Sequence, residues 1–121
     1  MKKEEIKSLL EEAVKNDQDL NGLMVYNLAT GEVVASTFSE DYSKKTIEIS
    51  KIFQGTEKEA VTIVESAGGT NWVMKSLNRK VIYDVHIKEG FWIFGETKIS
   101  EAPTAALEDG LELALMVGRL L

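Results

Sequence analysis

Residues 20–36 read LNGLMVYNLATGEVVAS, and this stretch decides the fold. An apolar run from Gly22 to Ala29 is followed by a second run, Val33 to Phe38, and both are suited to strands. Between them, Ala29-Thr30-Gly31-Glu32 offers a glycine that can adopt the positive φ of a tight turn. The stretch therefore predicts a β-hairpin.

The first strand of this hairpin is apolar on both faces, because Leu23 to Tyr26 are four consecutive apolar residues. Residues 91–94, FWIF, show the same property at the start of a strand predicted at Phe91–Ile99. A strand that is apolar on both faces lies inside a sheet whose two faces are both covered. We therefore expect these two strands to be central, with helices above and below them.

Apolar spacing assigns the remaining elements. Residues 2–16 and 43–67 show the i, i+3, i+4, i+7 spacing of amphipathic helices. Residues 70–77 and 79–88 are predicted strands joined by short turns. Pro103 suits the first turn of a last helix, which is expected to end at Leu121. The predicted order is helix, two strands, helix, three strands, helix.

We therefore predict one domain, residues 1–121, of the α+β class in three layers. A five-stranded antiparallel sheet is expected between helices on both faces. With strands numbered along the chain, the predicted order in the sheet is 2-1-5-4-3. That order makes the third strand, Thr70–Leu77, an edge strand, and the middle helix carries the chain from one edge to the other.

Gly55 leaves two interpretations of the middle helix open. A glycine inside a helix costs about 1 kcal/mol relative to alanine. Thr56-Glu57-Lys58-Glu59 has the pattern of a capping box that starts a second helix. We prefer one helix from Ser43 to Ala67 with a weak point at Gly55, and the alternative is two short helices.

Composition excludes several classes of function. The chain has no cysteine and one histidine, which excludes disulfides, thiol nucleophiles and zinc sites built on several histidines of one chain. Fourteen basic residues against twenty acidic ones give a net charge of −6, which argues against nucleic-acid binding. We expect no cofactor or metal. We also expect no membrane insertion and a cytoplasmic location, since no secretory signal or long apolar span is visible.

Catalytic groups are not apparent. The sequence contains no Gly-x-x-x-x-Gly-Lys-[Ser/Thr] phosphate loop. His86 shares a strand face with Asp84 and Lys88, and we interpret it as a surface or partly covered histidine. A protein with no enzymatic activity is therefore expected.

The last helix carries a stripe of small residues, Gly110, Ala114 and Gly118. We expect this stripe to pack closely on the sheet. A second apolar side of the helix must then meet the first helix or another molecule, because large apolar patches are uncommon on monomers.

The hairpin at residues 20–36 and the order of elements resemble the roadblock family, the dynein-light-chain-like domains with a profilin-like fold. The resemblance covers nearly the whole chain. It implies a non-catalytic homodimer, formed by joining two sheets and packing the middle helices together. It also implies a platform that regulates or scaffolds a small Ras-like GTPase or a motor or polarity complex.

On this interpretation the interface residues come from the middle helix and the third strand. They are Ile49, Ile52, Phe53, Ala60, Ile63, Trp72 and Met74. Trp72 lies on the predicted edge strand, and tryptophan is enriched in interface hot spots. Filling of the core is the alternative role for Trp72.

The alternative function is a small-molecule sensor on a profilin-like scaffold. Its ligand would lie between the sheet and a helix, lined by residues such as Tyr42, Tyr83 and His86. A small enzyme is a third and weaker hypothesis, because no catalytic constellation is recognisable.

Overall fold

The computed structural model describes residues 2–55, 62–65, 71–77, 80–98 and 103–121. Within these ranges, the side chains of residues 49, 52–55, 62–65, 71–77, 80–81 and 103–107 are not described. The elements in chain order are α1 (Lys3–Asn16), β1 (Leu20–Asn27), β2 (Val33–Ser36), α2 (Glu40–Gly55), β3 (Thr62–Glu65), β4 (Asn71–Leu77), β5 (Lys80–Lys88), β6 (Phe91–Lys98) and α3 (Pro103–Gly118).

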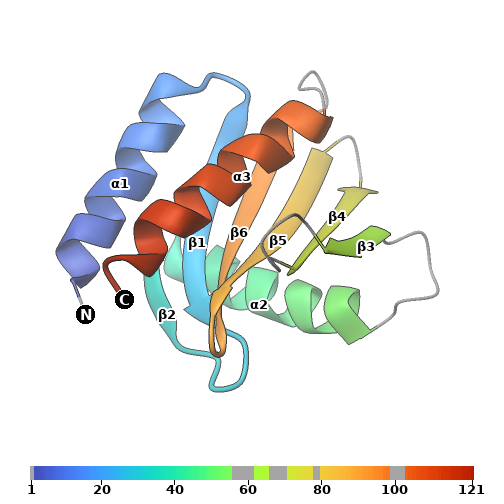
Figure 1. The fold of residues 1–121 in the computed structure, drawn as a ribbon, viewed down its shortest axis with the longest axis horizontal. Helices are drawn as coiled ribbons and strands as arrows, with labels where there is room; N and C mark the ends of the chain where they lie inside the picture. The colour runs from blue at the N-terminus through green and yellow to red at the C-terminus, as the bar shows by residue number, and fades with distance from the viewer. Residues whose placement is uncertain (1, 56–61, 66–70, 78–79, 99–102) are drawn as a thin grey trace.

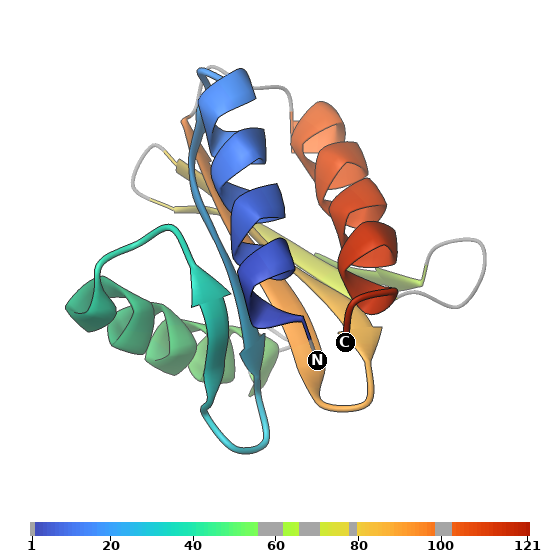
Figure 2. The ribbon, with the colours of Figure 1, turned by 90° about the vertical axis from the view of Figure 1, so that its left-hand side faces the viewer.

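The strands form one antiparallel sheet in the order β2-β1-β6-β5-β4-β3. Helices α1 and α3 lie side by side on one face of this sheet, and α2 lies on the other (Figures 1 and 2). The chain leaves one edge of the sheet after β2 and returns at the opposite edge in β3. The three-layer α+β class predicted from the sequence is therefore confirmed.

The pairing of β1 with β6 forms the centre of the sheet. Met24 pairs with Phe94 and Tyr26 with Trp92. Leu23, Met24, Val25 and Tyr26 are all fully buried, as the run of consecutive apolar residues predicts. Both faces of this strand pair therefore need a helix layer to exclude water.

The larger core lies between the sheet and helices α1 and α3. It contains Ile6 and Leu10 from α1 and Val117 from α3, all without exposed surface. The ring of Tyr83 in β5 lies where Gly95 and Gly110 leave room, since a Cβ at either glycine would come within 2.5 Å of the ring. The stripe of small residues in the last helix therefore packs on the sheet, as expected.

The hairpin between β1 and β2 has the predicted turn. Gly31 adopts φ +78°, a conformation that a residue with a Cβ rarely takes. The side-chain oxygen of Asn27 accepts hydrogen bonds from the backbone N–H groups of Ala29 and Thr30, at 3.0 and 3.1 Å. The turn is thus held by its own polar groups.

The predicted middle helix is wrong in its second half. Helix α2 ends at Gly55, and β3 pairs with β4 through Ile63–Val73 and Val64–Trp72. Residues 61–64, VTIV, are all β-branched, which favours a strand although their spacing also fits a helical stripe. The strand propensity and the glycine together override the helical pattern.

The sixth strand also changes the edge of the sheet. The predicted count of five strands is too low, because the sheet has a sixth strand, β3. This strand lies outside β4, at the end of the order β2-β1-β6-β5-β4-β3. Thr70–Leu77 was expected at the edge, but β4 pairs with β3 on one side and with β5 on the other. The edge strand of this side is β3.

The packing around Tyr83 gives a stability prediction. We expect Gly110→Ala to lower the free energy of unfolding by about 1–3 kcal/mol, because the new methyl group overlaps the tyrosine ring. Gly118→Ala is the matched control in the same helix, since its Cβ would lie 3.3 Å from Ile87 Cγ2. Chemical denaturation of both variants measures the difference, and equal effects of the two substitutions would contradict the packing.

Candidate functional site

Helix α2 covers the second face of the sheet and begins with a cap at Ser39. The Ser39 hydroxyl oxygen accepts a hydrogen bond from the backbone N–H of Tyr42, at 3.2 Å. The hydroxyls of Ser43 and Thr46 donate to carbonyl oxygens one turn earlier, those of Ser39 and Ser43. The Ser43 hydroxyl also lies 2.8 Å from that of Ser36 in β2, and the Thr46 hydroxyl lies 3.4 Å from Met24 Sδ in β1. These hydroxyls therefore stabilise the first turns of α2 and also connect the helix to the sheet.

A buried carboxylate anchors α2 to the central strands. Glu96 of β6 is 6% exposed and accepts hydrogen bonds from the hydroxyl of Tyr42 and from the amide of Asn21. Burial, the hydrogen bond to Glu96 and the charge of Glu96 together raise the pKa of Tyr42 to about 12. The phenol therefore remains a hydrogen-bond donor throughout the physiological range of pH.

A second carboxylate lies deeper under the same helix layer. Asp84 of β5 has no exposed surface, and the hydroxyl of Tyr26 donates a 2.6 Å hydrogen bond to its Oδ1. The sequence indicated Asp84 only as a neighbour of His86 and did not single out Glu96. The partners are 58 and 54 residues apart in the chain, so only the strand register reveals these pairs.

Aromatic rings pack beside these two carboxylates, on the side of the molecule where β2 lies. The ring of Phe38 lies 4.9 Å from that of Tyr42 and 6.1 Å from that of Phe94, as measured between centroids. Gly22 leaves the space that the Phe38 ring occupies, since a Cβ there would come within 2.2 Å of it. The carboxylates therefore lie in an environment of low polarity, where each hydrogen bond is strengthened.

His86 has a structural partner. Its Nε2 lies 2.7 Å from the carbonyl oxygen of Glu89, so this nitrogen donates a hydrogen bond into the turn between β5 and β6. The imidazole ring also lies 5.0 Å from the ring of Trp92. These contacts agree with a partly covered histidine of the strand end.

The residues suggested for a small-molecule pocket do not converge. Tyr83 belongs to the core under α1 and α3, packed between Gly95 and Gly110. Tyr42 lies on the opposite face, where it contacts Glu96. The alternation of side chains along β5 is the reason, because Tyr83 and His86 are an odd number of residues apart and so face opposite sides. The proposed lining is therefore wrong.

The structure places most of the predicted interface residues by their backbone only. Helix α2 contains Ile49, Ile52 and Phe53, and β3 contains Ile63. Strand β4 contains Trp72 and Met74, which pair with Val85 and Tyr83 of β5. Ala60 lies outside the described residues, as do the side chains of the other six.

Neither a metal-ligand cluster nor a membrane-spanning helix is found among the described residues. Among them, no three acidic or histidine side chains lie close enough together to hold a metal ion. None of the helices in the described segments is both long and apolar enough to cross a membrane.

The Tyr42–Glu96 pair leads to a pH prediction. Between pH 10 and about 12 the unfolded chain has lost the phenol proton that the folded chain retains, so stability falls as pH rises. We expect Tyr42→Phe to remove this part of the pH dependence. At neutral pH it should lower the free energy of unfolding by about 1–3 kcal/mol, because Glu96 loses a donor.

A double-mutant cycle with Glu96→Gln separates this bond from the loss of the hydroxyl itself. Denaturation at several pH values measures all four proteins. Additive effects of the two substitutions, with an unchanged slope above pH 10, would show that the pair does not anchor α2.

Comparison with known proteins places the fold. No family model matches the sequence, and a search of curated proteins finds no match. Solved structures do match in three dimensions. The Roadblock/LC7 domain of Streptomyces avermitilis aligns over 90% of this chain and 94% of its own, with 11% identity and a TM-score of 0.71.

Two further structures match over nearly the whole chain. MglB of Myxococcus xanthus covers 98% of this chain and 88% of its own, with 8% identity and a TM-score of 0.63. LokiProfilin1, solved in complex with rabbit actin, covers 98% of this chain and 97% of its own, with 11% identity and a TM-score of 0.66. At such identities the likeness establishes the fold alone. The chain thus has the profilin-like fold of Roadblock/LC7 domains, as the sequence predicted.

Proposed function

We propose that this protein is a non-catalytic, homodimeric binding platform for a small Ras-like GTPase or a polarity or motor complex. The observation that carries the proposal is the match to a Roadblock/LC7 domain over 90% of the chain. The roadblock resemblance implies this role, and MglB, a second structural neighbour, is described in a tetrameric arrangement. A cytoplasmic location is part of the proposal.

Self-association is proposed at the side of the molecule where α2 and β3 lie. An edge strand presents unpaired backbone groups that a second copy can pair with. Strand β3 has four residues and forms this edge of the sheet. We propose Ile49, Ile52, Phe53, Ala60 and Ile63 as contact residues, with Trp72 and Met74 on the strand next to the edge.

The dimer is tested by its mass. Light scattering at micromolar concentration should give about twice the chain mass of 13.4 kDa. Ile63→Lys should shift the protein toward the monomer, because a lysine at the edge opposes pairing between strands. Leu115→Lys is the matched control, since Leu115 is 66% exposed on α3, across the sheet from α2.

Circular dichroism must show that both variants remain folded. A strictly monomeric wild type at high concentration would refute the dimer. Equal dissociation by both lysine variants would refute its proposed location.

The partner class is tested by capture from the native cell. The immobilised protein is exposed to extract loaded with GDP or with a non-hydrolysable GTP analogue, and bound chains are identified by mass spectrometry. We expect a Ras-like GTPase whose recovery depends on the nucleotide. The purified protein alone should show no GTP hydrolysis, because it lacks a phosphate loop.

Two results would overturn this part of the proposal. One is the recovery of no GTPase in either nucleotide state. The other is intrinsic hydrolysis by the purified chain that a point substitution abolishes.

A further inference from the structure

Two hollows line the junction of α1 and α3, on the face of the sheet opposite α2. The first, about 450 Å³, is lined by α1 and Leu120, and the second, about 410 Å³, lies between α1 and α3. Glu12 lines the first hollow and Ala13 the second, so the hollows follow one another along α1. We call them together the α1–α3 groove.

The groove has an apolar floor. Its apolar lining residues are Leu9, Ala13, Leu20, Leu113, Met116 and Leu120. Met116 is 39% exposed, so this part of the apolar floor is open to solvent. The sequence predicts that the second apolar side of the last helix meets the first helix or another molecule. In the structure this side contacts α1 only in part.

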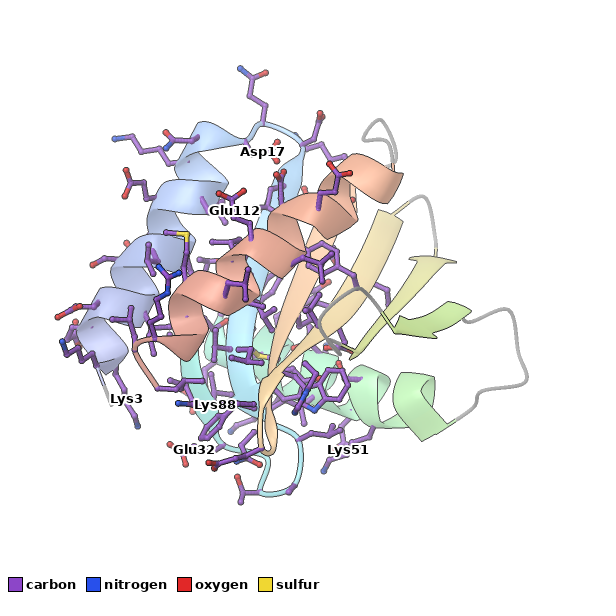
Figure 3. The ribbon with its side chains drawn as sticks, in the orientation of Figure 1. Lys3, Asp17, Glu32, Lys51, Lys88 and Glu112 are labelled. Atoms are coloured by element: carbon purple, nitrogen blue, oxygen red, sulfur yellow. The ribbon has the colours of Figure 1, made fainter. Side chains whose placement is uncertain are left out.

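The rims of the groove are acidic on both helices. Six lining residues are carboxylates, and none is lysine or arginine: Glu4, Glu5, Glu12, Asp17, Asp109 and Glu112. The three ion pairs between described residues are Lys3–Glu32, Lys44–Glu40 and Lys51–Glu48, so none involves these six acids. Figure 3 shows Asp17 at the end of α1 and Glu112 on α3 near one another.

These carboxylates also repel one another. Partial burial, followed by the charges of Asp17, Glu112 and Glu108, raises the pKa of Asp109. A positive charge in the groove would relieve this repulsion. Cationic side chains of a partner, spaced along the groove, would supply that charge.

We propose that the α1–α3 groove binds an amphipathic helix of a partner protein, with an apolar stripe flanked by lysine or arginine. The stripe covers the apolar floor, and the flanking cations meet the acidic rims. A helix fits better than an extended peptide, because α1 and α3 offer no unpaired strand edge to which an extended backbone could bond. The 14 residues of α1 give a length of about 21 Å, or four turns of partner helix.

The sign of the charge decides between classes of partner. Anionic lipid surfaces and nucleic acids carry the same sign as the rims and would be repelled. This proposal goes beyond the proposed function, because α1 and α3 lie across the sheet from α2 (Figure 2). A dimer formed through α2 and β3 would leave the face of α1 and α3 open.

The test uses a defined probe. A fluorescein-labelled 16-residue peptide carries leucines at i, i+3, i+4 and i+7 spacing and lysines elsewhere, and fluorescence anisotropy measures its binding to the full chain. A peptide of the same composition, rearranged to have no apolar stripe, is the control. We expect the striped peptide to bind about tenfold more tightly than the rearranged one.

Matched variants locate the site. The double variant Asp109→Asn/Glu112→Gln should weaken binding about fivefold, whereas Glu40→Gln/Glu48→Gln on α2 removes the same charge and should change it less than about twofold. Met116→Gln should also weaken binding. Amide chemical shifts should change along α1 and α3.

Four results would overturn the proposal. Equal binding of the two peptides, or equal weakening by the two double variants, would show general charge attraction only. Shift changes confined to α2 would place the peptide elsewhere. If Asp109→Asn/Glu112→Gln converts a homodimer to monomers, the groove holds a second copy of the chain and not a partner protein. A monomeric wild type would refute the proposed dimer but would leave this inference standing.

Discussion

The structure depends on the pairing of β1 with β6, because the paired segments Leu23–Tyr26 and Phe91–Phe94 are apolar on both faces of the sheet. Leu23 and Val25 face α1 and α3, while Met24 and Tyr26 face α2, and all four are fully buried. A sheet with such a centre cannot leave either face in water. The layered arrangement, and the long crossing of the chain from β2 to β3, follow from this requirement.

The two faces are covered in different ways. The α1 and α3 side is a continuous apolar core, in which Tyr83 packs between two glycines. The α2 side buries a smaller apolar cluster together with the carboxylates of Asp84 and Glu96. Because removing a partner from a buried charge is costly, α2 is positioned by a few specific hydrogen bonds as well as by area. Helix α2 therefore has a defined position, although it buries less apolar surface against the sheet than α1 and α3 do.

The sequence predicted the features that are encoded locally. The turn at Gly31, the two central strands and the close packing of the stripe at Gly110 each rest on a few neighbouring residues. Strand β3 was missed because VTIV at residues 61–64 fits both a helical stripe and a strand. The Tyr42–Glu96 and Tyr26–Asp84 pairs join distant segments, so they follow from the register and from no local pattern.

Amide hydrogen exchange of the native protein tests this account most directly. If the β1–β6 pair is the constraint on which the fold depends, its amides exchange only through global unfolding and are the slowest in the chain. The amides of α2 should exchange faster, through an opening that leaves the central strands protected. Slowest exchange in α2, with β1 and β6 exchanging at lower protection, would contradict the account.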